Sequence, residues 1–299
     1  MTFDARKGSE LPGSNNSLYA AVVVAVVGGA FFLALTVPLP GKATSPDKPR
    51  TDVIATLEPA APPTPTLLSS KSAEKYFETL HRVDPAASRA LQKRLIEGAN
   101  LPASVQSQIA FEHAAELFKR RSGDLALADT RHVDDLLSMT RESLRSASRS
   151  RSAWCKGSQY AALDQASFTD GSKVIEELEM LEEPLRDFGY DVMTSLLVAI
   201  EDAEEHPVRH GALTPTDKAA LQGVMMSMVS DPQVMPLLMA AQSGADTDAV
   251  MKSLNVCELG ATAMTALKTL PQDTKGRVFA DLVRQSGSNG VNLESLTRF

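Results

Sequence analysis

The chain has very few residues of the kinds that build compact metal or catalytic motifs. Of its 299 residues only Cys155 and Cys257 are cysteine, one is tryptophan, and 5% are aromatic. No C-x-x-C pair is present and no histidine lies close to a cysteine, which excludes the common zinc-finger spacings. G-x-S-x-G, Walker and G-x-G-x-x-G motifs are absent as well. We therefore expect no cofactor and no metal, and a binding protein is favoured over an enzyme.

Charge is distributed unevenly along the chain, although the formal net charge is only −7. Residues 71–157 carry 15 Lys and Arg against 11 Asp and Glu, whereas residues 158–299 carry 10 against 21. An acidic total argues against generic nucleic-acid binding, because a phosphate backbone needs a basic face. The pattern predicts that the basic and acidic segments dock on each other.

One long uncharged run follows a short N-terminal tail, residues 1–17. Residues 18–37 read LYAAVVVAVVGGAFFLALTV, 20 residues without a charge. At 1.5 Å per residue a helix of this length spans about 30 Å, the thickness of a bilayer core. A cleavable signal peptide would have a shorter apolar region followed by an A-x-A-like site. The run therefore predicts an uncleaved membrane anchor, whose flanking positive charges nearly balance and do not decide its orientation.

Small residues recur at every fourth position within this run, at Ala21, Ala25 and Gly29. Such a row lets two membrane helices approach closely, so it suggests a homodimer through the anchor. The alternative is that alanine and glycine are simply common in membrane helices.

Residues 38–70 are rich in proline, alanine and threonine and contain few large apolar residues. Such a segment does not bury enough surface to fold, so we predict an extended linker. Beyond it, residues 71–299 are dominated by strong helix formers. We predict an all-α domain, an irregular array of about nine to eleven short helices.

Proline and glycine mark the expected ends of these helices. Proline is tolerated in the first turn of a helix, and Asp or Thr before it is a good N-cap. The expected starts are Asp84-Pro85, Leu101-Pro102, Thr214-Pro215, Asp231-Pro232 and Leu270-Pro271. Thr214 and Asp217 resemble a capping box. Gly98, Gly123 and Gly244 are the expected stops.

The two cysteines allow three interpretations: a disulfide, two buried free thiols in a cytosolic protein, or a nucleophile. A disulfide is favoured, because the anchor and linker are typical of a protein exported to an oxidising compartment. Closing a loop of about 100 residues is worth up to about 4–5 kcal/mol in the chain-entropy model. Trp154 is then expected to pack beside the bond.

A row of arginines precedes the first cysteine. Arg141, Arg145 and Arg149 are four residues apart and share one face of a helix. The row suits phosphates, anionic lipid headgroups or an acidic partner. The alternatives are that the arginines form a solvated face, or that they dock internally on the acidic stretch 176–187. The glutamates of that stretch are themselves interpreted as the solvated face of a short helix.

A second polar segment contains Glu201, Asp202, His206 and His210. Two histidines four residues apart beside carboxylates suit a metal or a hydrolase, but Pro207 lies between them and breaks a helix. A helix end with exposed histidines is therefore favoured, and a hydrolase with a carboxylate and histidine site is the alternative function.

Seven of the eleven methionines fall in one 40-residue window. Core filling, an adaptable apolar groove for a partner, and soft ligands for Cu(I) are the three interpretations. The members are Met225, Met226, Met228, Met235, Met239, Met251 and Met264.

Anchor, linker and helical body together resemble, in layout alone, membrane-tethered folding factors and envelope accessories. We expect a bacterial inner-membrane protein with its N-terminus in the cytoplasm and its C-terminal domain in the periplasm. Its expected role is to bind an envelope protein partner, as a scaffold, assembly factor or steric chaperone.

Overall fold

The structure is a computed structural model that describes residues 70–101, 103–159, 183–229, 231–236, 239 and 247–288. These residues form ten α-helices and two short 3-10 helices, and their only β-pairing is one isolated bridge. The all-α prediction is thus confirmed for the described part of the chain. The elements are α2 (Lys71–Val83), α3 (Pro85–Glu97), α4 (Ala103–Arg120), α5 (Ser122–Leu125), α6 (Thr130–Ser150), η1 (Ala153–Cys155), η2 (Gly157–Gln159), α9 (Glu183–Glu205), α10 (Pro215–Val229), α12 (Thr247–Ser253), α13 (Val256–Lys268) and α14 (Gln272–Ser288).

Local capping explains several of these boundaries. The Asp84 carboxylate accepts the backbone N–H of Ala87 at 2.9 Å, and Pro85 occupies the first position of α3. Proline has no N–H to leave unpaired there, so the predicted start is confirmed. Gly98 follows the last residue of α3, as predicted.

One predicted stop is wrong. Gly123 was expected to end a helix, but α4 already ends at Arg120 and Gly123 lies inside the single turn of α5. The Arg121 guanidinium bonds the Asp124 carboxylate at 2.6 Å across this turn. The helix is thus interrupted at Arg121 and restarts at once, which glycine position alone does not reveal.

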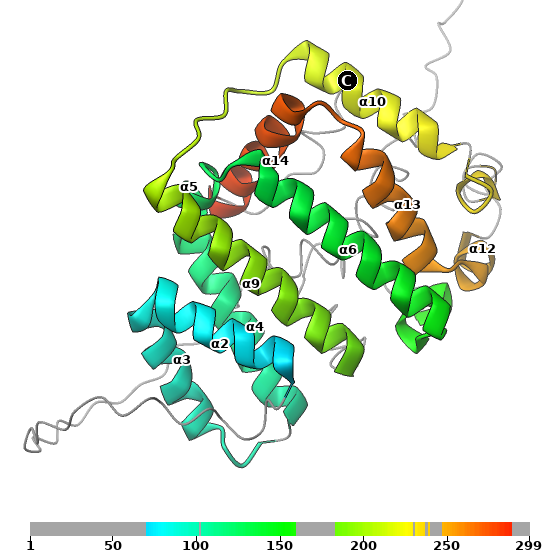
Figure 1. Cartoon of the computed structure of the whole chain (residues 1–299). Coiled ribbons are helices and arrows are strands. Elements are labelled where there is room, and N and C mark those ends of the chain that lie inside the picture. The colour runs from blue at the N-terminus through cyan, green and yellow to red at the C-terminus, as the bar shows by residue number, and fades with distance from the viewer. Residues whose placement is uncertain are drawn as a thin grey trace, which may run out of the picture.

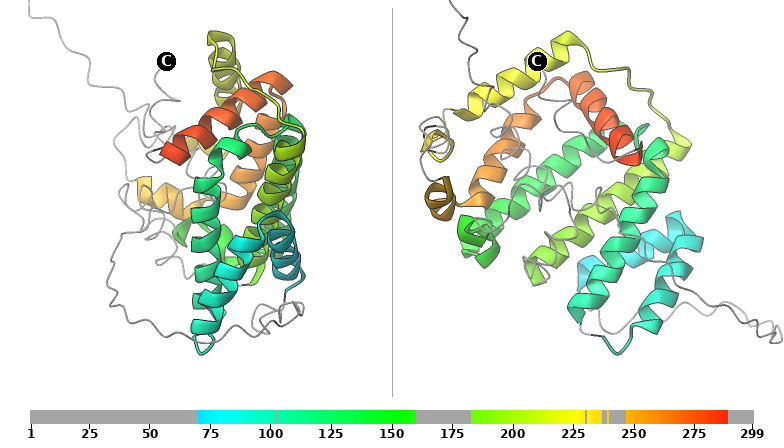
Figure 2. Two further views of the ribbon diagram at one scale, coloured as in Figure 1. Left: turned by 90° about the vertical axis from the view of Figure 1, so that its left-hand side faces the viewer. Right: turned by 180° about the vertical axis from the view of Figure 1, so that it is seen from behind.

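The helices pack in two layers. α6 lies between α9 and α13 and runs antiparallel to both, while α10 lies on the outer side of α13 (Figure 1). α2 packs along α9, and α4 and α14 lie behind the row (Figure 2).

The main core lies between these layers and is built from leucine, alanine and a few aromatic rings. Tyr76 and Tyr190 are fully buried, and the ring of Phe111 stacks on Tyr190 with centroids 5.1 Å apart. Phe111 also lies over Gly189, where a Cβ atom would come within 2.7 Å of the ring. A glycine is therefore required in α9 for this aromatic cluster to close.

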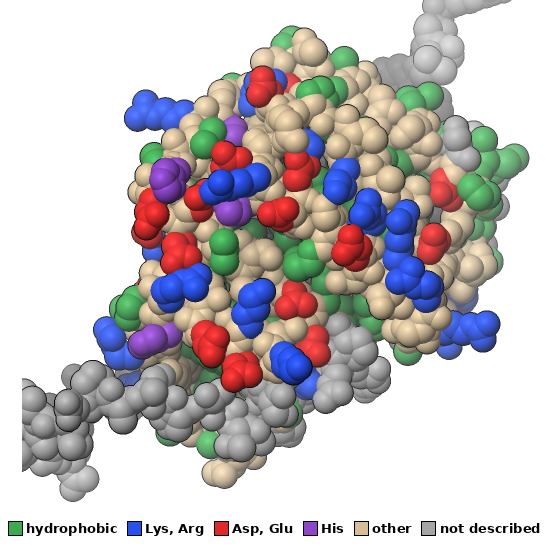
Figure 3. All heavy atoms as spheres, viewed as in Figure 1, with side chains coloured by type: hydrophobic (Ala, Val, Ile, Leu, Met, Phe, Trp, Pro, Cys, Tyr) green, Lys and Arg blue, Asp and Glu red, His purple; other side chains and the backbone are tan. Residues whose placement is uncertain are grey.

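Ion pairs join the basic and acidic segments at the C-terminal end of α9. Arg82, Arg121 and Arg131 come from the basic segment. Their partners on α9 are Glu201, Glu204 and Asp202, respectively. The predicted docking of the two segments therefore takes place here (Figure 3), where acidic, basic and histidine side chains alternate on the surface.

The predicted anchor 18–37, with Ala21, Ala25 and Gly29, and the linker 38–69 lie outside the described residues. Within the described part of the chain, no helix is both long enough and apolar enough to cross a bilayer.

Candidate functional site

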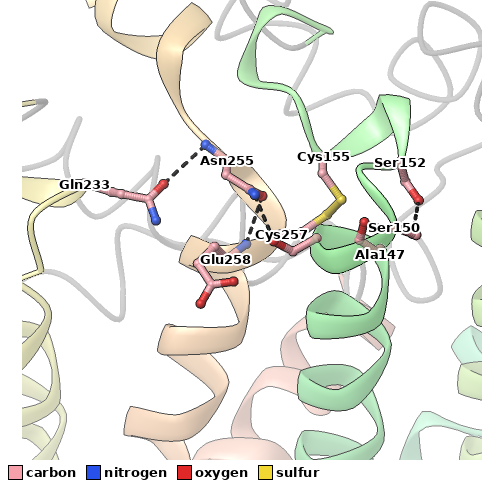
Figure 4. The surroundings of a disulfide bond; sticks show 9 residues. Ala147, Ser150, Ser152, Cys155, Gln233, Asn255, Cys257 and Glu258 are labelled. Carbon is pink, nitrogen blue, oxygen red and sulfur yellow. Dashed lines mark hydrogen bonds between the residues drawn. A yellow bond between two sulfur atoms is a disulfide. The ribbon is translucent and has the colours of Figure 1, made fainter.

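A disulfide and several hydrogen bonds join the end of α6, the two 3-10 helices and the start of α13. Cys155 in η1 and Cys257 in α13 form a disulfide there, with their Cα atoms 5.0 Å apart and a sequence separation of 102 (Figure 4). Cys257 is fully buried and Cys155 is nearly so. The bond agrees with the sequence prediction and occupies both cysteines of the chain.

Asn255 ties the same corner together through polar contacts. Its carboxamide caps α13 by accepting the N–H of Glu258 at 3.1 Å and donates to the Ser148 hydroxyl of α6 at 2.8 Å. Its own N–H donates to the side chain of Gln233 at 3.2 Å (Figure 4). Lys156 pairs with Asn255 in the isolated β-bridge. The end of α6 and the start of α13 are therefore joined by hydrogen bonds as well as by the disulfide.

Trp154 lies directly before the bonded cysteine. It is half-buried and packs against the core cluster that contains both Cys155 and Cys257. Packing of the ring against the disulfide itself stays a prediction. Because it is the only tryptophan in the chain, its fluorescence reports on this corner alone.

The arginine row does not behave as one unit. Arg141 is largely buried and lies 3.3 Å from Glu142, its neighbour on α6. Arg145 and Arg149 are exposed and form no ion pair with another described residue. Blue side chains are visible over this half of α6 (Figure 3). Most of the acidic stretch 176–187 lies outside the described residues, so internal docking stays a prediction.

The acidic and histidine segment at the end of α9 does not converge on one centre. Glu201 forms a bidentate pair with Arg82, with bonds of 2.7 and 2.8 Å. His206 is exposed, whereas His210 bonds the Ala128 carbonyl oxygen at 2.8 Å. Among the residues that the structure describes, no three His, Cys, Asp or Glu side chains are arranged so that they could hold a metal ion. The ion pairs of this segment join α9 to α2, to the residue before α5 and to α6.

Asp202 has three polar neighbours in this segment. Its carboxylate contacts His132 at 2.9 Å, pairs with Arg131 and lies 3.5 Å from His206. The hydrogen bond from His132 is the main cause that holds the pKa of Asp202 below its ordinary value. Sequence reasoning missed His132 and Arg131, because they lie about 70 residues away and no local spacing connects them to α9.

A second carboxylate, Asp217 of α10, has no exposed surface. The predicted capping box is present, since Asp217 accepts the Thr214 N–H at 2.8 Å and Thr214 accepts the Asp217 N–H at 3.2 Å. Arg277 of α14 donates twice to the carboxylate at 2.8 Å and Thr274 donates at 2.7 Å. These bonds, led by the guanidinium, hold the pKa of Asp217 well below its usual range. This polar contact fixes α10 against α14.

The methionines divide between core and surface. Met228 and Met264 are buried, as core filling predicts. Three others expose between 47% and 67% of their surface, on α10 and on the segment after it. This exposed group, called here the methionine surface, consists of Met226, Met235 and Met239. Nearby hydrophobic side chains gather beyond the end of α10 in the space-filling view (Figure 3).

No known protein family matches the chain, and neither the curated proteins nor the solved structures contain a significant match.

Proposed function

We propose that the chain is a membrane-tethered helical protein of the bacterial cell envelope that acts by binding another protein. The anchor is residues 18–37, the linker is residues 38–70, and the periplasmic body is residues 71–299. The disulfide supports this location, because such bonds persist in oxidising compartments and are rare in the cytosol. The role that fits is that of a scaffold, assembly factor or steric chaperone.

The observation that carries the proposal is the methionine surface. Met226 of α10 and Met239 of the following segment expose 67% and 66% of their surface. Val224 and Met228, also on α10, are buried. Contiguous exposed apolar patches mark interaction sites, and we infer that these three methionines, all between positions 226 and 239, contribute to one such patch. Thioether side chains are flexible and polarizable, so they adapt to apolar partners of different shapes. A periplasmic partner with an exposed apolar segment fits this surface.

Site-specific crosslinking in cells tests the proposal. A photoreactive amino acid replaces Met226 or Met235 in the full-length chain, and Lys93, an exposed residue of α3, is the control position. We expect a reproducible crosslinked partner from the methionine positions and none from position 93. Recovery of only the chain itself, or the same adducts from all three positions, would contradict the interaction role.

The alternative function, an envelope hydrolase, receives less support from the described residues. Glu201 is held by Arg82, and Asp202 is held by Arg131 and His132. A general acid or base must reach the substrate atom with which it exchanges a proton. The oxygens of these two carboxylates instead accept hydrogen bonds from side chains of other helices.

Topology has a separate test. Alkaline phosphatase fused after Phe299 is active only if the body is exported, whereas a fluorescent protein fused there is bright only if it stays inside. We expect phosphatase activity. Bright fluorescence with no phosphatase activity would contradict the periplasmic location.

Dimerisation through the anchor rests on Ala21, Ala25 and Gly29. A Gly29→Leu variant places a bulky side chain in the row and is expected to weaken self-association in a membrane reporter. A Val23→Leu variant, outside the row, is the matched control.

A further inference from the structure

Five exposed cations surround the disulfide corner. They belong to the last two turns of α6, to the residue after it, to the bridge residue before η2 and to α12. We call this group the cationic rim; it consists of Arg145, Arg149, Arg151, Lys156 and Lys252.

The segments that carry the rim are in contact with one another. Ser148 of α6 bonds Asn255, and the bridge joins Asn255 to Lys156. The N–H of Gly157 bonds the Leu254 carbonyl at 2.8 Å, and η2 packs against α12. Together with the disulfide, these bonds hold the rim on a rigid support.

The rim cations are free of ion pairs with other described residues, unlike the arginines at the opposite end of α6. There, Arg82, Arg121 and Arg131 are each matched by a carboxylate of α9. The two ends of the basic segment therefore differ: the cations at one end are paired with carboxylates of α9, and those at the other end are exposed.

The backbone at Arg151 adds an independent observation. Arg151 caps α6 in the left-handed region with φ of 54°, and it is the only non-glycine residue with positive φ in the described chain. Glycine is the usual residue at such a position, because a Cβ atom is strained there. A non-glycine residue is uncommon at such a position, and backbone outliers of this kind cluster at functional sites.

We propose that the cationic rim binds an acidic segment of a partner protein. This inference rests on the proposed interaction function and adds the chemistry of one binding surface. Arg145 and Arg149 lie one turn apart on α6, about 6 Å, a spacing that carboxylates four residues apart on a helix reproduce. Guanidinium groups also bind carboxylates in a bidentate geometry that favours arginine over lysine.

An anionic lipid surface is the competing ligand, and two features disfavour it. Glu142 and Glu258 are exposed beside the rim and would repel a continuous sheet of negative charge. None of the exposed large hydrophobic residues among the described side chains lies on α6, η1, η2 or α12, so these side chains offer no apolar anchor for a bilayer.

The test measures binding of a fluorescein-labelled peptide of alternating glutamate and alanine to the full-length chain in phosphatidylcholine nanodiscs. Arg145→Gln and Arg149→Gln are each expected to weaken binding about two- to fivefold, the range for one exposed ion pair. The matched control is Arg89→Gln with Lys93→Gln, an exposed pair four residues apart on α3, which is expected to leave binding unchanged.

Arg151→Gly separates binding from folding. It removes one rim charge and relieves the backbone strain, so it is expected to weaken peptide binding about twofold or more while thermal stability stays equal or rises. A structural role for Arg151 would instead lower stability. Unchanged binding in this variant, or equal losses in the α3 control, would overturn the proposal.

Protein-free vesicles containing phosphatidylglycerol form the lipid arm of the same experiment. Sedimentation of the nanodisc-bound chain with these vesicles, and displacement of the peptide by them, would replace the acidic partner with a lipid surface. Peptide binding that survives the vesicles supports the proposal. If crosslinking through Met226 recovers a partner but the peptide does not bind, the interaction function stands and only the rim assignment fails.

Discussion

Removal of the disulfide is the perturbation whose effect the structure defines best. In a Cys155→Ala, Cys257→Ala variant the chain loses a link between residues 102 positions apart. Chain entropy for a loop of this length predicts a loss of about 4.7 kcal/mol in the free energy of unfolding at 25 °C. That loss is a large part of the roughly 5–15 kcal/mol that stabilises a typical domain. The hydrogen bonds of Asn255 remain, so we expect a weakened body rather than an unfolded one.

Urea unfolding of the oxidised protein, followed both by Trp154 fluorescence and by far-ultraviolet circular dichroism, measures this loss. Reductant should lower the midpoint of the wild-type protein and leave the double-alanine variant unchanged, which shows that it acts through this bond alone. An equal midpoint for both proteins, or two free thiols in protein isolated without reductant, would refute the reasoning.

Two further predictions concern contacts that hold the body together. Gly276→Ala places a Cβ atom 2.5 Å from the ring of His210, which its hydrogen bond to the Ala128 carbonyl holds in place. We therefore expect this variant to lose about 1–3 kcal/mol of the free energy of unfolding. Its control, Gly223→Ala, meets nothing within 4 Å and should be neutral or stabilising by up to about 1 kcal/mol in the same urea assay. The pKa of Asp217 is lowered in the folded state, so its stabilisation is complete above the unfolded value of about 4 and is lost as pH falls below it. Asp217→Asn should therefore lower the unfolding midpoint at pH 7 and flatten its decline from about pH 4 to 2, and an equally steep decline would contradict the assignment.

Local sequence signals predicted much of the architecture. The Asp84-Pro85 start, the box of Thr214 and Asp217, and the stop at Gly98 all act within four residues along the chain. Their physical causes are hydrogen bonds and steric limits that need no tertiary structure. Helix type and several boundaries could therefore be read from the sequence.

Long-range polar partners could not be read in this way. Asp217 and Arg277 are 60 positions apart, and nothing in either neighbourhood distinguishes this arginine from the others. The same holds for His210, whose partner is a backbone carbonyl 82 positions away. Such contacts follow from the packing of α10 and α14 on the body, which a single sequence does not specify.

The methionines show a third limit. Apolar residues occur all around α10, so periodicity does not select the face that is buried. Val224 and Met228 are buried while Met226 between them is exposed, a choice made by the neighbouring α13 and not by the helix itself. Core filling and an interaction surface were both reasonable interpretations; the structure contains buried methionines, as core filling predicts, and exposed ones, on which the proposed interaction rests.

Charge gives the clearest link between sequence and the proposed function. The basic segment carries four more cations than anions, and docking on the acidic segment was the expected explanation. Among the described residues, the arginines near the end of α9 are used in that way, whereas the cationic rim forms no ion pair with any of them. Even paired charges at a protein surface contribute little to the free energy of folding. The unpaired cations of the rim therefore contribute little to the stability of the body. The proposed linker, residues 38–70, reaches about 100 Å when extended and allows the body to present this rim to partners well away from the membrane.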